Sequence, residues 1–149
     1  MVMRGRHPLD ALLKQRRWER EDLSLEAARA RRIWEDRSAE HQAVLEVIAR
    51  TESQLRELYE ARVGFAPERR SILEVFLKHQ HEIAGERRQA VAWAHKLYGQ
   101  VMAQLEVSRV AVKVLEKHAE RTKRTQDDRE RRSELRTADD MWLLRRGSR

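Results

Sequence analysis

Apolar side chains recur along the first sixty residues at alternating intervals of four and three positions. Ten of the sixteen repeat positions are apolar, while most residues between them are charged or polar. A repeat that averages 3.5 residues keeps one narrow face of a helix turned toward a partner helix. The pattern therefore predicts a coiled-coil helix over about 8–63 rather than a helix on a globular core. The positions are Leu9, Leu13, Arg16, Arg20, Leu23, Ala27, Ala30, Trp34, Arg37, His41, Val44, Ile48, Thr51, Leu55, Leu58 and Arg62.

A short turn separates this helix from a second one. Gly64 suits the position just after a helix end, with Phe65 as the apolar partner of the cap, and Pro67 suits the first turn of a new helix. We therefore expect a turn at about 64–67 and a second helix over about 68–144. Because the connection is short, the two helices should be antiparallel neighbours.

The second helix has a repeat of its own, with one irregularity. The step from Trp93 to Leu105 proceeds by fours, which predicts a local stutter in the supercoil. In this register Trp34 and Trp93 lie in neighbouring layers and act as packing anchors. The repeat positions are Ile72, Phe76, His79, Ile83, Glu86, Ala90, Trp93, Leu97, Val101, Leu105, Ser108, Val112, Leu115 and Ala119.

These features predict an all-α fold, a long two-helix antiparallel coiled-coil hairpin in which the second helix is longer than the first. We expect residues 1–149 to form a single domain of this kind, in the shape of a rod. A turn near residue 65 places Leu9 opposite about residue 121, so the second helix should overhang by about twenty residues, or 30 Å. The composition agrees, since 38% of residues are charged and only five are Gly and two Pro, which is typical of long helices.

The net charge of +7 is concentrated near the two ends of the sequence. Residues 1–20 and 117–149 each carry an excess of four basic groups, and the middle is close to neutral. An antiparallel hairpin brings both ends to one basic pole, which attracts acidic partners. Acids at 127, 128, 130 and 134 are interleaved with the basic residues and would also face phosphates, so we expect no nucleic-acid partner.

The sequence contains no constellation that supports catalysis. It has no cysteine, no phosphate-binding glycine loop and no zinc-protease motif. His79 and His81 are two positions apart and point to different faces of a helix, and adjacent acids such as Asp127 and Asp128 diverge. We therefore expect no catalytic, cofactor-binding or metal-binding residues, no cofactor and no enzymatic activity. No signal peptide and no integral membrane segment are visible.

Two groups of apolar residues lack an obvious internal partner. One lies near the turn, where Tyr59 and Leu77 fall off the repeat and should be exposed beside Phe65 and Phe76. The other lies beyond the end of the first helix and contains Met141, Trp142, Leu143 and Leu144, followed by Arg145 and Arg146. Because Trp and Arg are favoured interface anchors, this end of the chain is a candidate docking segment.

The pattern resembles the type III secretion ATPase central stalk proteins, the flagellar FliJ and virulence YscO-SctO family. The resemblance covers nearly the whole chain through length, charge, helical architecture and absence of cysteine. Its most local part is the stretch 72–83 after the turn, together with Gln54, Leu55 and Tyr59 before it. It implies a non-enzymatic coupling protein of a flagellar or injectisome export apparatus, cytoplasmic and peripheral to the inner membrane.

The resemblance also implies partners and candidate contact residues. The partners would be a hexameric secretion ATPase, the cytosolic ring of the export gate and secretion chaperones. The candidate gate contacts are Leu55, Tyr59, Phe76, Gln80 and Ile83, and the candidate ATPase contacts are Met141, Trp142, Leu143, Leu144, Arg145 and Arg146.

Two alternatives remain open at this stage. The chain could be a coiled-coil scaffold that forms homodimers, or a basic helical protein that binds nucleic acid. A hairpin whose seam is satisfied internally should be a monomer when isolated, so a size measurement separates the first alternative from the stalk. A salt-dependent mobility shift on DNA or RNA would indicate the second.

Overall fold

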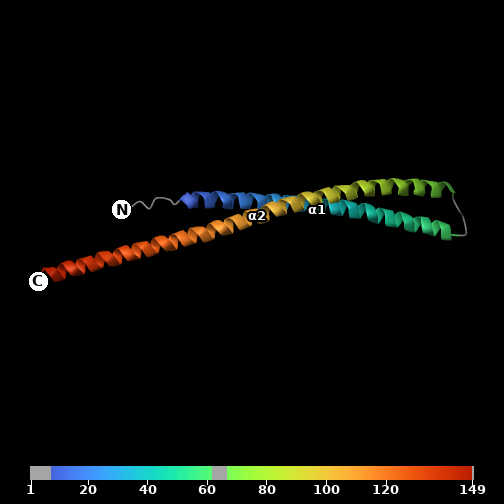
Figure 1. Cartoon of the computed structure of the whole chain (residues 1–149). Helices are drawn as coiled ribbons and strands as arrows, with labels where there is room; N and C mark the ends of the chain where they lie inside the picture. Colours follow the sequence, from blue (N-terminus) through green and yellow to red (C-terminus); the bar gives the residue numbers. More distant parts are fainter. Residues whose placement is uncertain (1–7, 62–66, 149) are drawn as a thin grey trace. The chain divides into compact units, whose positions relative to one another are not determined.

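The chain forms two long α-helices. The computed structural model describes residues 8–61 and 67–148, which contain no strand. Helix α1 spans Pro8–Glu60 and helix α2 spans Pro67–Gly147 (Figure 1). Each begins with proline, whose fixed φ suits the first helical position. The predicted all-α fold, with two helices of which the second is the longer, is confirmed.

The helix ends differ slightly from the predicted bounds. Helix α1 ends at Glu60, three residues earlier than predicted, although the N–H of Ala61 still donates to the carbonyl of Glu57 at 2.9 Å. Helix α2 continues past residue 144 to Gly147, with Arg145 and Arg146 in its last turn, where the negative end of the helix dipole favours basic side chains. The expected cap at Gly64 and Phe65, and the repeat position Arg62, lie outside the described residues.

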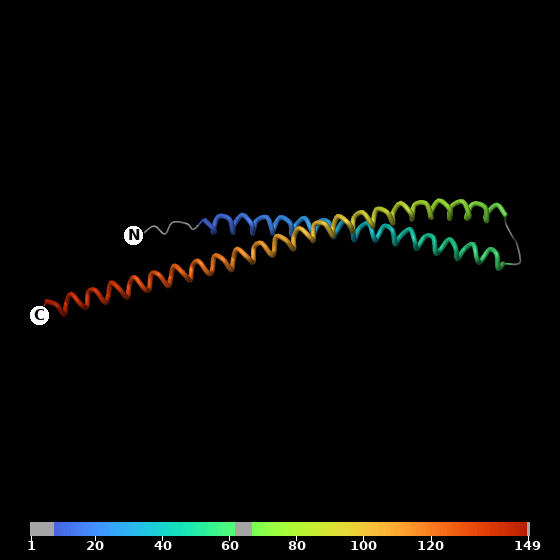
Figure 2. Tube along the Cα trace, in the orientation of Figure 1, coloured from blue at the N-terminus to red at the C-terminus, as the bar shows by residue number. Residues whose placement is uncertain are grey.

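The chain divides into two compact units. The turn-side unit comprises residues 22–105, and the terminal unit comprises residues 1–21 together with 106–149. Each unit contains a segment of α1 and a segment of α2, and the tube in Figure 2 traces both helices through their full described length. That residues 1–149 form a single domain remains a prediction.

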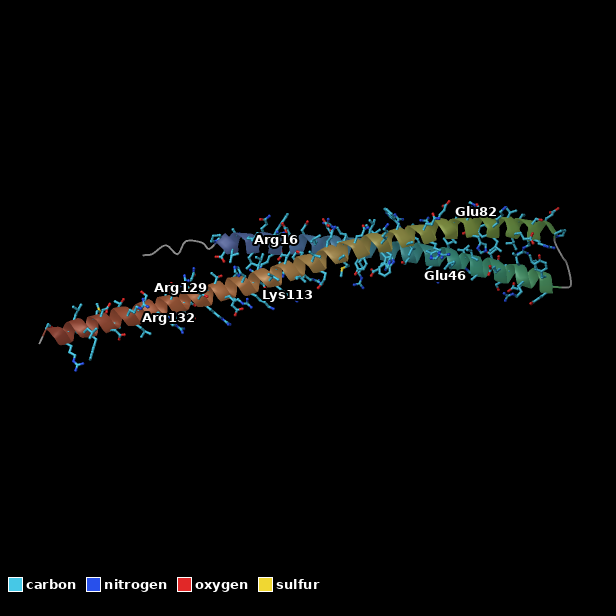
Figure 3. The ribbon with its side chains drawn as sticks, viewed as in Figure 1. Arg16, Glu46, Glu82, Lys113, Arg129 and Arg132 are labelled. Atoms are coloured by element: carbon cyan, nitrogen blue, oxygen red, sulfur yellow. The ribbon has the colours of Figure 1, made fainter. Side chains whose placement is uncertain are left out.

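Contacts between the helices establish an antiparallel pair in the turn-side unit. The rings of Trp34 and Tyr98 stack with centroids 5.7 Å apart, and Arg87 Nη1 donates to Glu40 Oε2 at 2.8 Å. Residue numbers that rise along α1 therefore meet falling numbers along α2, and the two helices run side by side (Figure 1). Glu46 and Glu82 project from the outer sides of the pair (Figure 3).

The predicted repeat of α1 forms the inner face of this unit. Ala27, Ile48, Thr51 and Leu55 are buried, and the repeat positions between them are half-buried, except Arg37, which is exposed. The one buried polar side chain of the described core, Thr51, donates its hydroxyl to the carbonyl of Val47 at 2.8 Å. This bond satisfies the hydroxyl within α1 and lets a polar residue occupy the seam.

The predicted repeat of α2 is wrong over its first half. Trp93, which was expected in the seam, is 61% exposed, and Ile72, Phe76, His79 and Leu97 are also exposed. The seam is instead displaced by one position toward the C-terminus. Its members in this unit are Arg70, Leu73, Leu77, Gln80, Ala84, Arg87, Val91, Ala94, Tyr98, Val101 and Leu105, all buried or half-buried except Arg87.

This correction removes the stutter and changes the partner of Trp34. The true seam keeps alternating intervals of three and four throughout, so nothing loosens the supercoil between Trp93 and Leu105. Trp34 packs against His95, at a centroid distance of 4.8 Å, and Tyr98 rather than against Trp93. Leu77, expected to be exposed, is half-buried in the seam.

The two candidate repeats of α2 are equally apolar, which explains the error. Over the compared stretch, six of eight positions are apolar both in the predicted repeat from Ile72 to Leu97 and in the true one from Leu73 to Tyr98. Only the second continues in phase into the later positions Val101 and Leu105. An unbroken phase was therefore the sequence signal that separates the two.

In the terminal unit the same seam continues for a few turns and then stops. Leu13 on α1 and Val112 on α2 are buried, and Arg17 Nη2 donates to Glu116 Oε1 at 3.1 Å. Beyond Thr122, every described residue is exposed. The seam phase there falls on polar residues, so α2 no longer offers an apolar face in that phase. These residues are Gln126, Arg129, Ser133, Arg136 and Asp140.

We call residues 123–148 the C-terminal extension. Its labelled side chains Arg129 and Arg132 project from the helix (Figure 3). Local contacts support the helix here, since Arg124 Nη2 donates to Glu120 Oε1 at 2.7 Å and the guanidinium of Arg146 lies 4.8 Å from the Trp142 ring centroid. Pairs one turn apart stabilise a helix by a few tenths of a kcal/mol each.

Candidate partner-binding surfaces

A small polar cluster joins the helices near the end of α1. The Tyr59 hydroxyl donates to Glu74 Oε1 at 3.1 Å, and Arg70 Nε donates to the same oxygen at 2.9 Å. The Arg70 guanidinium also lies 4.8 Å from the centroid of the Tyr59 ring. This cluster was not predicted from the sequence, because Arg70 lies outside the predicted repeat and Glu74 belongs to no motif.

Hydrogen bonding in this cluster shifts two pKa values. The bonds from Arg70 and then Tyr59 lower the pKa of Glu74, and the bond to Glu74 raises the pKa of Arg70. Both groups remain in contact with solvent, so the charges are screened and the cluster mainly orients its members. It holds the Tyr59 ring against α2 while leaving about half of that side chain exposed.

The five candidate gate contacts do not share one surface. Tyr59 and Phe76 are exposed, at 54% and 41%. Leu55 is buried in the seam, and Gln80 and Ile83 are half-buried. A partner that approaches this unit without opening it therefore reaches Tyr59, Phe76 and part of Ile83, but not Leu55.

The predicted repeat positions from Ile72 to Leu97, together with Gln100 and Gln104, form a surface that we call the outer stripe, in which only Ile83 and Ala90 are half-buried and the other positions are exposed. It runs along α2 with the same four-and-three spacing as the seam. A shallow apolar hollow lies at its start, lined by Ser71, Ile72, Val75, Phe76 and His79. The outer stripe consists of Ile72, Phe76, His79, Ile83, Glu86, Ala90, Trp93, Leu97, Gln100 and Gln104.

A second apolar surface lies at the end of the C-terminal extension. Met141, Trp142, Leu143 and Leu144 are all more than half exposed. No described residue of α1 covers them, in agreement with the prediction that this cluster lies beyond any internal partner. The helical backbone spaces the four side chains around the helix, so the apolar surface encircles it. Arg146 stacks on Trp142 and adds a basic group to the same surface.

The described residues contain no group of three His, Cys, Asp or Glu side chains able to hold a metal ion. His81 Nε2 lies 3.8 Å from Glu52 Oε1 and His79 Nδ1 lies 3.9 Å from Glu82 Oε2, as two separate pairs. Neither described helix is apolar over a stretch long enough to cross a membrane.

The geometry defines a helical hairpin whose described residues include an exposed apolar surface on α2 in the turn-side unit and another on the C-terminal extension. Comparison with known proteins adds no relative: no family model, no curated protein and no solved structure matches the chain. The function is therefore argued from these surfaces and from the charge of each unit.

Proposed function

We propose that this chain is a non-enzymatic stalk protein of a bacterial type III secretion apparatus, which couples the subunits of a hexameric secretion ATPase. The observation that carries the proposal is the C-terminal extension, which is helical from residue 123 to Gly147, whose described residues are all exposed and whose end is apolar and arginine-rich. A helix of this kind has its backbone polar groups satisfied internally and presents only side chains to a partner.

The dimensions of a single helix support insertion into a narrow ring. With side chains, an α-helix is about 10–12 Å across, which is less than a helix pair occupies. The exposed Trp142 and Leu144 gain hydrophobic free energy when a surrounding protein removes them from water. Arg145 and Arg146 can form bidentate bonds with carboxylates of the ring.

The charge distribution supports an acidic partner for the same unit. The described residues of the terminal unit carry sixteen basic and twelve acidic side chains, whereas those of the turn-side unit carry twelve basic and thirteen acidic ones. An excess of positive charge steers encounters with an acidic surface and makes the association rate sensitive to salt. Interleaved acids in the extension weigh against a nucleic-acid partner.

The exposed residues of the turn-side unit are the candidate contacts for the export gate and for chaperones. Tyr59 and Phe76 carry this part of the proposal, since both are exposed and the cluster around Glu74 holds Tyr59 in place. Leu55 and Gln80 would act indirectly, by packing α1 against α2 beneath them. The protein would work at the cytoplasmic side of the inner membrane, without a membrane segment or cofactor of its own.

The test is binding to the hexameric secretion ATPase of the same organism. We expect the double variant Trp142→Ala, Leu144→Ala to lose about tenfold or more in affinity, because central aromatic anchors commonly contribute 2 kcal/mol or more. Removal of residues 139–149 should abolish both the binding and any stimulation of ATP hydrolysis.

Trp18→Ala is the matched control. Trp18 is as exposed as the tail tryptophan and belongs to the same unit, but it lies on α1. Its replacement should leave ATPase binding unchanged. Unaltered binding after removal of residues 139–149 would rule out the role assigned to the extension.

A further inference from the structure

The outer stripe of α2 is a second coiled-coil face rather than a scatter of exposed residues. Its ten positions keep the heptad spacing over the whole turn-side part of α2, six of them are apolar, and Glu86 is the only charged one. Ile72 and Trp93 are among the most exposed large apolar side chains of this unit. A helix with two such stripes can pack against two different helices, because both stripes follow the same supercoil.

Charge is depleted around the second half of this stripe on α2, and not on the part of α1 that lies beside it. Residues 89–105 of α2 contain one charged side chain, Lys96, whereas residues 28–44 of α1, which pack beside them, contain seven. Depletion of charge with retention of aromatic residues is the composition of an interface core. The second half of the outer stripe therefore has the composition of a surface that another protein covers.

We propose that the outer stripe pairs antiparallel with the same stripe of a second copy of this chain. A two-fold axis near residue 84 places Ile72 opposite Leu97 of the second copy, and Phe76 opposite Trp93 of the second copy. The same axis places His79 opposite Ala90. Each large apolar side chain near one end of the stripe thus meets a large apolar side chain near the other, as a self-complementary interface requires.

The centre of this arrangement contains its weakest layer, because Ile83 lies opposite Glu86 of the second copy. A carboxylate beside an apolar side chain loses water without gaining a partner, which limits affinity. The layer therefore predicts a reversible dimer rather than a permanent one. Replacing Glu86 by an apolar residue should therefore strengthen association.

This dimer does not depend on the proposed function, since it leaves the C-terminal extension uncovered. It revises the monomer expected from the sequence, which considered only one seam. Pairing would cover Phe76 and Ile83, so a dimer and a partner bound at those residues would exclude each other.

The experiment is sedimentation equilibrium of the full chain over about a hundredfold range of concentration, where mass action makes a weak dimer visible. We expect a monomer–dimer equilibrium that Trp93→Glu weakens by at least tenfold and Glu86→Leu strengthens by a similar factor. Leu25→Glu, an exposed leucine of the same unit on α1, is the matched control and should change nothing. Circular dichroism checks that each variant keeps its helical content.

Crosslinking tests the direction of pairing, and the absence of native cysteine keeps it unambiguous. A mixture of His79→Cys and Ala90→Cys chains should form mixed disulfide dimers in preference to dimers of either variant alone. A monomer at every concentration, a dimer that ignores Trp93→Glu, or preferential formation of Ala90→Cys homodimers would each overturn the proposal.

Discussion

Leu105 and Val107, two positions apart on α2, differ sharply in how much of each residue is exposed to solvent. Leu105 is 2% exposed and Val107 is 71% exposed, although both are aliphatic residues in the same helix. We expect Leu105→Ala to lower the free energy of unfolding by about 2–5 kcal/mol, since it removes buried methyl groups and leaves a cavity. Val107→Ala should change it by less than about 0.5 kcal/mol.

Urea unfolding of the full chain, followed by circular dichroism, measures both values. Comparable destabilisation by the two variants would show that the seam is not where the structure has it.

Glu74 gives the molecule a specific sensitivity to acid. Its pKa is lowered in the folded state by bonds from Arg70 and Tyr59, so its contribution to stability is present above the unfolded pKa and disappears as the pH falls through the folded value. The raised pKa of Arg70 adds stability below the unfolded value of that group, which covers the whole of this range. A titration of stability against pH should therefore show only the loss that accompanies protonation of Glu74.

We expect Glu74→Gln to be less stable than the parent chain at neutral pH, and the difference to close well below the ordinary carboxyl pKa of 4.5. Thermal unfolding from neutral pH to pH 3 measures this difference. Glu46→Gln alters an exposed carboxylate on the outer side of α1 (Figure 3). The stability of this variant should change with pH in the same way as that of the parent chain. A constant difference between Glu74→Gln and the parent at all pH values would contradict the assigned cause.

At the scale of the helices, α1 was predicted well and α2 only in part. In α1 the apolar positions form a single stripe, and charged residues exclude every other phase. In α2 two stripes compete, because the repeat from Ile72 to Leu97 and the repeat from Leu73 to Tyr98 contain the same number of apolar positions. Periodicity identifies a helix face, but the partner helix decides which of two similar faces it covers.

Two glycines weaken α2 without a visible packing reason. Gly85 and Gly99 have open space where a Cβ would lie, while glycine in a helix interior costs roughly 1 kcal/mol relative to alanine. We expect Gly85→Ala and Gly99→Ala each to raise the free energy of unfolding by about 0.5–1 kcal/mol. Ala92→Gly, at an exposed position one heptad from each, is the converse control and should lower it by a similar amount.

At the scale of the whole molecule, the seam and the surfaces outside it depend on the two helices pairing within one chain. Glu40→Cys with Arg87→Cys tests this directly, because the two native side chains meet at 2.8 Å. We expect a short bismaleimide to link the two cysteines within one molecule, at a yield independent of protein concentration. Electrophoretic mobility and mass spectrometry distinguish the internal link from dimers.

Glu40→Cys with Gln104→Cys is the control for this crosslink. Seventeen residues separate Gln104 from Arg87 along α2, about 25 Å at the helical rise, so no internal link should form. Concentration-dependent links in the first variant would mean that the helices pair between chains.

The candidate sites were less predictable than the fold. The apolar end Met141–Leu144 was identified correctly as exposed, because no residue of the first helix can reach so far along the second. The group near the turn was not, since its members divide between the seam and the surface according to single-residue differences in phase. Leu55 and Gln80 face inward for this reason, while Tyr59 and Phe76 face outward.

The unbroken phase of the seam restricts how the length of such a protein can change. An insertion or deletion within one helix displaces every later side chain around the helix axis, and only a whole heptad returns them to the same face. A change in one helix must also be matched in the other, or the layers on either side of it lose their partners. Natural variants of different length should therefore differ by matched heptads in the paired regions, whereas after Thr122, where no described residue of α1 packs on α2, this restriction on length does not apply.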